Sequence, residues 1–284
     1  LYLPLSLWLL AQMVYQSFQV LILYHRRFTL AGMVELIGFS VVLVSVWSVP
    51  GNLPKELLVW AFAASFIVRS MLLFATMNPG QPTFGLDRTF LRACFPFFLI
   101  GLSGMLQSKT DLYIVNFMME DVEVGLYQIV ITIYLFYQAA AGFLLEPLAR
   151  NLYRAKSTVF RKLGRSMAIF GLLLLVLTLP LQYLVFEWFY GFPLSWDYYL
   201  YGCLFAFPVF LYLPIIYRLY KVKKEGRVMM LNFMAAVVNG GYTWILLSQM
   251  GLTGALLGSA LAQWFLLAVY AFWNSKLKKE ADAV

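Results

Sequence analysis

The residues of this 284-residue chain that can do chemistry are isolated polar side chains inside long apolar runs. If the segment near 90–118 is helical, at 100° per residue one stripe of it carries four polar residues, with a carboxylate beside the stripe. These residues are Arg92, Ser103, Gln107 and Thr110, and the carboxylate is that of Asp111. Such a stripe can line a polar path through a membrane, or it can hydrogen-bond helices together. The sequence leaves both interpretations open.

Two further sites have the same ambiguity. Tyr127, Tyr134 and Gln138 share one face of the next apolar segment, where they can line a polar path or join helices. Arg69 lies inside the third apolar run, where a charge costs on the order of 2–3 kcal/mol to insert. Arg69 can contact a phosphate, reach the interface with its long side chain, or pair with Glu35 at a similar depth in the second run.

Enzyme motifs are missing from the sequence. It contains no His/Glu metal set, no phosphate-binding glycine loop and no usefully placed Ser/His/Asp combination. Cys94 and Cys203 each lie in an apolar run without a CxxC motif, so we expect neither a disulfide framework nor a metal site. The sequence thus predicts a protein that is not an enzyme and needs no cofactor.

The elements that must position these residues are membrane-spanning helices. Hydrophobic residues make up 62% of the chain and charged residues 12%, against roughly 45–50% and 25% in soluble domains. The apolar runs do not alternate in polarity, which excludes a transmembrane barrel. We therefore predict an all-α, polytopic transmembrane helix bundle of nine spans near 1–24, 28–49, 56–77, 90–118, 124–147, 165–186, 196–217, 228–247 and 253–274.

The basic residues give these spans an orientation. Lys and Arg gather in every second connection, among them 150–165 and 218–227, and in the tail after 274. The intervening loops are acidic or nearly free of basic residues, and aromatic residues such as Trp188 and Trp196 mark predicted interfaces. The positive-inside rule then predicts a cytoplasmic C-terminus. The net charge of +8 belongs to these loops, so we expect anionic membrane lipids and no nucleic acid as partners.

A weak internal repeat suggests a larger plan. Residues 1–77 and about 197–274 share the order span, basic turn after a tyrosine, span, short loop, span. The turns begin at Tyr24 and Tyr220, an offset of about 196 residues. A parallel repeat of six helices would leave three helices, roughly 100 residues, missing before residue 1.

Two segments resemble the polysaccharide-transporter branch of the multidrug/oligosaccharidyl-lipid/polysaccharide exporter superfamily. The first runs from Thr110-Asp111 through "VEVGLY" to Tyr127, and the second is "NFMAAVVNGGYTWILLSQMGLTGALLG", residues 232–258. In the second, the residues that fit the family pattern are Asn239, Gly251, Gly254 and Ala255, with Gln249-Met250 where a proline is common. "RTFLRACFPFFLIGLSGML" and "EPLARNLYR" are similar to further parts of the pattern. We expect Gly254 and Gly258 to be a packing pair.

The resemblance implies most of a two-lobed, twelve-helix transporter, with residues 1–87 ending the first lobe and 88–284 forming the second. Such proteins move an isoprenoid-pyrophosphate-linked oligosaccharide, such as an O-antigen unit, across the cytoplasmic membrane by alternating access. Other polysaccharide-assembly proteins would then be partners. A cation-coupled multidrug exporter is the alternative within the superfamily. A membrane glycosyltransferase or ligase would need a large outer loop, and the longest here, about 187–195, is short.

Overall fold

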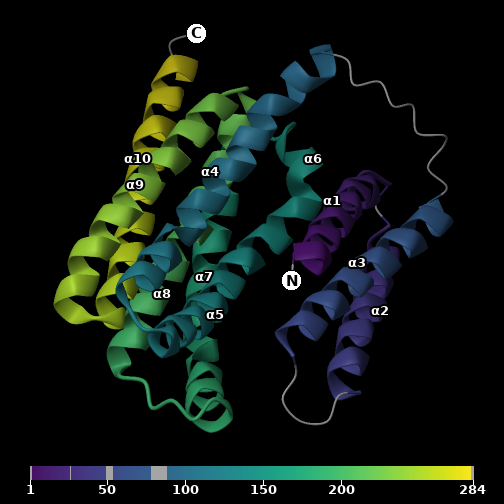
Figure 1. Cartoon of the computed structure of the whole chain (residues 1–284). Helices are drawn as coiled ribbons and strands as arrows, with labels where there is room; N and C mark the ends of the chain where they lie inside the picture. The colour runs from purple at the N-terminus through teal and green to yellow at the C-terminus, as the bar shows by residue number, and fades with distance from the viewer. Residues whose placement is uncertain (1, 26, 49–53, 78–87, 283–284) are drawn as a thin grey trace. The chain divides into compact units, whose positions relative to one another are not determined.

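The computed structural model describes residues 2–25, 27–48, 54–77 and 88–282, and these are helical almost throughout (Figure 1). The described residues form two compact units, which we call unit 1 (Leu1–Gly85) and unit 2 (Leu86–Val284). The protein is an all-helical, polytopic bundle, as the sequence predicts. The assignment of the two units to the lobes of a transporter stays a prediction.

Unit 1 contains three helices: α1 (Tyr2–His25), α2 (Phe28–Trp47) and α3 (Lys55–Met77). α3 packs against both α1 and α2, and α1 and α2 meet each other over a smaller area. A small core forms where the three helices meet, around Tyr15, Val34 and Leu73.

Unit 2 contains six long helices: α4 (Arg88–Met118), α5 (Asp121–Leu145), α7 (Ser157–Leu184), α8 (Trp196–Lys221), α9 (Glu225–Met250) and α10 (Leu252–Asp282). A 3-10 turn (Glu146–Leu148) and α6 (Ala149–Leu152) connect α5 to α7, and a π-helical turn (Val185–Phe189) ends α7. Neighbours in the bundle are α4 and α9, α9 and α10, α10 and α8, and α8 with both α5 and α7 (Figure 1).

Seven helices of the described part are long and apolar enough to cross a membrane: α2, α3, α5, α7, α8, α9 and α10. The count covers only the part of the chain that the structure describes, and the sequence alone predicts spans at the other two long helices, α1 and α4. α4 carries the polar run from Gln107 to Asp111 in its second half. The helices thus support a multi-pass membrane protein, with each predicted span near 1–274 occupied by one long helix.

Two helices extend furthest beyond the predicted spans, by eight residues each. α7 begins at Ser157, eight residues before the expected start at 165, and α10 continues to Asp282 instead of ending at 274. Both extensions are rich in Lys and Arg, which a search for apolar runs excludes although these residues are good helix formers. The sequence therefore located the membrane-embedded part of each helix and missed its polar extension.

The turn between α9 and α10 explains one of the motif glycines. Gly251 has φ +65° and ψ −147°, a backbone conformation that residues with a side chain rarely adopt. It lets α10 begin at once, so that α9 and α10 pack as an antiparallel pair along their length. This helix pair carries Asn239, Thr243 and Ser259, which belong to the site described next.

Candidate functional site: a buried polar network in unit 2

A network of hydrogen bonds joins four helices of unit 2 around Asp111. The Asp111 carboxylate of α4 is almost fully buried. Its Oδ2 atom accepts hydrogen bonds from Tyr127 of α5 (2.6 Å) and from Ser259 of α10 (2.9 Å). The Oδ2 atom of this buried carboxylate therefore binds hydroxyl groups of two neighbouring helices.

Asn239 extends the network into α9. Its amide nitrogen donates to the backbone carbonyl of Gln107 on α4 (3.2 Å), which fixes the orientation of the amide. Its Oδ1 then faces the hydroxyls of Thr243 and Ser259, each at 3.2 Å. The network thus links both segments that carry the family resemblance, because Asp111 and Tyr127 belong to one and Asn239 to the other.

The hydrogens in this network can be counted. Ser259 has one hydroxyl hydrogen but lies close to two acceptors, Asp111 Oδ2 and Asn239 Oδ1. If Asp111 is ionised, one of these two contacts has no hydrogen. If Asp111 is protonated, it donates to Ser259 and Ser259 donates to Asn239, so that each contact is a hydrogen bond. The number of hydrogen bonds that Ser259 makes therefore depends on the protonation of Asp111.

The network lies toward one end of the bundle. Asp111, Thr243 and Ser259 are each seven residues from the nearer end of their helix, and Tyr127 is six residues from the start of α5. At 1.5 Å per residue these positions are about 10 Å deep. The opposite helix ends carry the basic residues, among them Arg161, Arg218 and Arg227.

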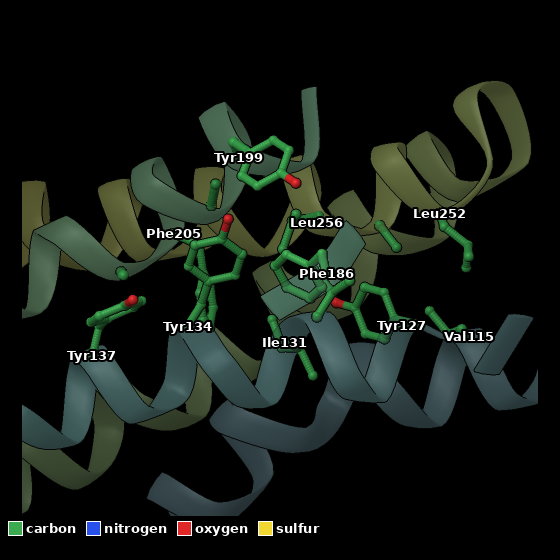
Figure 2. Packing of buried hydrophobic residues seen from close by; sticks show 14 of the residues in the cluster. Val115, Tyr127, Ile131, Tyr134, Tyr137, Phe186, Tyr199, Phe205, Leu252 and Leu256 are labelled. Carbon is green, nitrogen blue, oxygen red and sulfur yellow. The ribbon is translucent and has the colours of Figure 1, made fainter. Parts of the chain in front are cut away.

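A second group of polar residues lies further along α5. Tyr127 and Tyr134 project from the same side of α5 into the packed core, together with Ile131 (Figure 2). Tyr134 is fully buried, and its hydroxyl donates to Gln182 of α7 (3.0 Å) or to the Tyr198 carbonyl of α8 (3.2 Å). Gln138 donates to the Phe205 carbonyl of α8 (3.0 Å). The predicted tyrosine face thus joins α5 to α4 through Tyr127, and to α7 and α8 through Tyr134 and Gln138.

The remaining predicted site residues of α4 have separate positions. The Thr110 hydroxyl bonds to the Leu106 carbonyl of its own helix (2.5 Å), and Gln107 enters the network through its backbone oxygen. Arg92 belongs to α4, but its side chain lies outside the part that the structure describes. The role of these residues as substrate ligands stays a prediction.

Arg69 lies in unit 1 and is paired. Its guanidinium is 2.8 Å from Glu35 of α2, and Glu35 also accepts a hydrogen bond from Tyr15 of α1. The guanidinium lies over the rings of Tyr15 and Phe66, at 5.6 and 5.0 Å from their centroids. The pairing with Glu35, one of the sequence-based alternatives, is present. The Nε atom of Arg69 is buried without a hydrogen-bond partner, so the residue retains one free donor.

Sequence reasoning missed Thr243, Ser259 and Gln182 as members of these networks. All three are buried polar residues within apolar helices. A search of each apolar run for isolated hydroxyl and amide side chains would have found them, although it would not have paired them. Among the described residues no group of three or more His, Cys, Asp or Glu could hold a metal ion.

Comparison with protein-family models, with curated proteins and with solved structures found no match. The arrangement of the site is therefore the basis for assigning a function.

Proposed function

We propose that the chain belongs to a flippase that moves an isoprenoid-pyrophosphate-linked oligosaccharide across the cytoplasmic membrane. The supporting observation is that Asp111, Tyr127 and Asn239, which come from the two segments with the family resemblance, meet in one buried network. Segments more than 100 residues apart in the sequence thus meet in one hydrogen-bond network. The multi-pass helical bundle supplies the scaffold that such a transporter needs.

In this proposal the network closes one half of unit 2 during part of the transport cycle. An alternating-access protein must hold one end of its bundle shut while the other is open, and packed helices switch between discrete arrangements. A network within about 10 Å of one end can act as such a closure. With the basic connections in the cytoplasm, the closure lies toward the outer leaflet and the C-terminus is cytoplasmic.

The test is a lipid measurement in the host cell. The full-length gene is depleted, lipids are extracted, and isoprenoid-pyrophosphate-oligosaccharides are quantified by mass spectrometry. We expect one such lipid to accumulate and to return to its normal level when the intact gene is restored. An unchanged lipid pool, in cells that make polysaccharide normally and have no redundant flippase, would contradict the proposal.

A cation-coupled multidrug exporter is the second candidate, and one observation favours it. The network concentrates oxygen atoms of Asp111, Asn239 and Ser259, the kind of ligand that hard cations and protons use. Drug efflux from vesicles that carry the protein, driven by a sodium or proton gradient, would support this candidate. Efflux without any effect on lipid-linked glycans would replace the flippase proposal.

A further inference from the structure

Unit 2 contains a cleft that is separate from the Asp111 network. It lies between α7, α8 and α10 and has a volume of about 250 Å³. Phe160, Pro214 and Ile215 contribute apolar walls, and Arg161, Arg218 and Asn274 contribute polar groups. Among the described residues that line the cleft there is no Asp or Glu. The cleft therefore combines positive charge with an apolar lining.

The polar groups of the cleft lie at one level of the membrane. The apolar spans run over Thr158–Phe189 in α7, Trp196–Lys221 in α8 and Leu252–Lys276 in α10. Arg161, Arg218 and Asn274 are each within three residues of the end of their span, and all at the basic end of unit 2. This is the level at which lipid phosphates meet the hydrocarbon.

Arg161 and Arg218 differ in burial and in their hydrogen-bond partners, and both have N–H donors left for an anion. Arg218 is partly buried and donates through Nη1 to Asn274 Oδ1 (2.6 Å), which holds the guanidinium against α10. A guanidinium has five N–H donors, so four remain for other acceptors. Arg161 is exposed and has no hydrogen-bond or ion-pair partner among the described residues. An anion between these side chains would gain charge-assisted hydrogen bonds from both.

We propose that this cleft binds the phosphate of an anionic phospholipid from the leaflet at the basic end of the bundle. The phosphate lies between Arg161 and Arg218, and the start of an acyl chain lies along Phe160 and Ile215. Basic pockets between transmembrane helices are suited to anionic headgroups, and the apolar walls favour a lipid over a soluble anion. This site does not depend on the proposed transport function.

The test compares lipid binding to the purified full chain by native mass spectrometry. The detergent-solubilised protein is titrated with phosphatidylglycerol and, separately, with phosphatidylcholine. The main variant is Arg161→Gln, which removes an exposed side chain without a partner. Arg165→Gln is the matched control, because Arg165 is exposed one turn further along α7 and does not line the cleft. Arg218→Gln is a second variant, and unfolding midpoints check that each protein is folded.

We expect the intact chain to prefer phosphatidylglycerol over phosphatidylcholine. Arg161→Gln should weaken phosphatidylglycerol binding about fivefold, whereas Arg165→Gln should have little effect. Equal losses for Arg161→Gln and Arg165→Gln would overturn the proposal, because binding would then follow net charge alone. Equal binding of both lipids would also overturn it. Displacement of phosphatidylglycerol by millimolar orthophosphate or pyrophosphate would instead assign the cleft to a soluble phosphate.

Discussion

Asp111 is the residue on which the polar network of unit 2 depends. Its Oδ2 atom receives Tyr127 from α5 and Ser259 from α10, so one carboxyl group connects three helices. Burying an ionised carboxylate costs free energy unless it is paired, whereas a protonated carboxyl group can donate to Ser259 and leave the Ser259 hydrogen for Asn239. Substitutions at Asp111 can therefore separate a need for its charge from a need for its hydrogen bonds.

This reasoning predicts different effects for two substitutions at Asp111. Asp111→Asn can place its amide oxygen where Oδ2 stands and accept from both Tyr127 and Ser259, so it should change the free energy of unfolding by less than about 1 kcal/mol. Asp111→Leu leaves buried hydroxyls unpaired and should cost about 1–3 kcal/mol for each. Thermal unfolding midpoints of the purified protein in detergent measure both. A variant Asp111→Asn that is as unstable as Asp111→Leu would show that the ionised carboxylate is needed.

A second residue-scale prediction concerns the ion pair of unit 1. Glu35→Gln or Arg69→Met alone leaves the partner charge uncompensated, which should cost about 1.5–3 kcal/mol, the range for hydrogen bonds to charged groups. The double variant removes both charges and should be more stable than either single variant. Thermal unfolding of the four proteins completes the cycle. If the two single effects simply add, the 2.8 Å contact contributes no coupling energy.

The candidate site was only partly predictable from the sequence, for a reason visible in these residues. Asp111, Tyr127 and Tyr134 were identified because a polar group in an apolar run is conspicuous. Their partners Ser259 and Gln182 were not, because helix periodicity shows which face a residue lies on and not which helix it meets. That α4 lies beside α9, and α5 beside α8, follows only from the packed structure.

At the scale of the element, the close packing of α9 and α10 positions Ser259. Gly258 precedes Ser259 and lies against the backbone of α9, so that an added Cβ would be 2.7 Å from the Thr243 nitrogen and 2.9 Å from its Cα. Gly254, the other member of the expected packing pair, also lies against α9. Backbone atoms cannot move aside as a flexible side chain can, so these glycines set the distance between the helices.

Gly258→Ala should accordingly separate α9 from α10 and lower stability by about 1–3 kcal/mol, the usual cost of overpacking. Gly241→Ala is the control, because an added Cβ at Gly241 of α9 meets nothing within 4 Å. That change should be neutral, or stabilising by up to about 1 kcal/mol through helix propensity. Unfolding midpoints of both variants decide the matter. If Gly258→Ala and Gly241→Ala have the same unfolding midpoint, α9 and α10 can move apart without loss of stability.

The helices themselves were predictable because a membrane limits the possible structures. Every backbone amide must be paired within its own segment, so an apolar run of sufficient length becomes a helix. The errors at α7 and α10 fall where the helix leaves the apolar layer, since that criterion no longer applies there. The α9–α10 turn was marked in advance by Gly251, although only the structure gives its positive φ.

At the scale of the whole molecule, the basic residues of unit 2 gather at the helix ends opposite the Asp111 network. Arg161, Arg218 and Arg227 lie at the helix ends opposite the Asp111 network, whereas Trp188 and Trp196 lie at the other end with 89% and 76% of their surface exposed. Exposed tryptophans at helix ends are typical of membrane interfaces. The positive-inside rule predicts that the basic end lies in the cytoplasm, and this orientation stays a prediction.

Two positions on either side of α7 test this orientation. Arg154 is exposed before α7, and Pro193 is exposed between the π-helical turn and α8, so one membrane crossing separates them. In a background with Cys94→Ala and Cys203→Ala, the variants Arg154→Cys and Pro193→Cys are each treated with a membrane-impermeant maleimide in intact and in permeabilised cells. We expect Pro193→Cys to react in both and Arg154→Cys only after permeabilisation.

The possible outcomes separate the two parts of this expectation. The reverse pattern would keep α7 as a crossing and invert the protein, which would place the Asp111 network toward the cytoplasm and the arginine cleft in the outer leaflet. Labelling of both positions in intact cells would mean that α7 does not cross, against its 28-residue length and apolar composition. The expected pattern gives the network and the cleft opposite sides of the membrane, because each lies near a different end of the same helices.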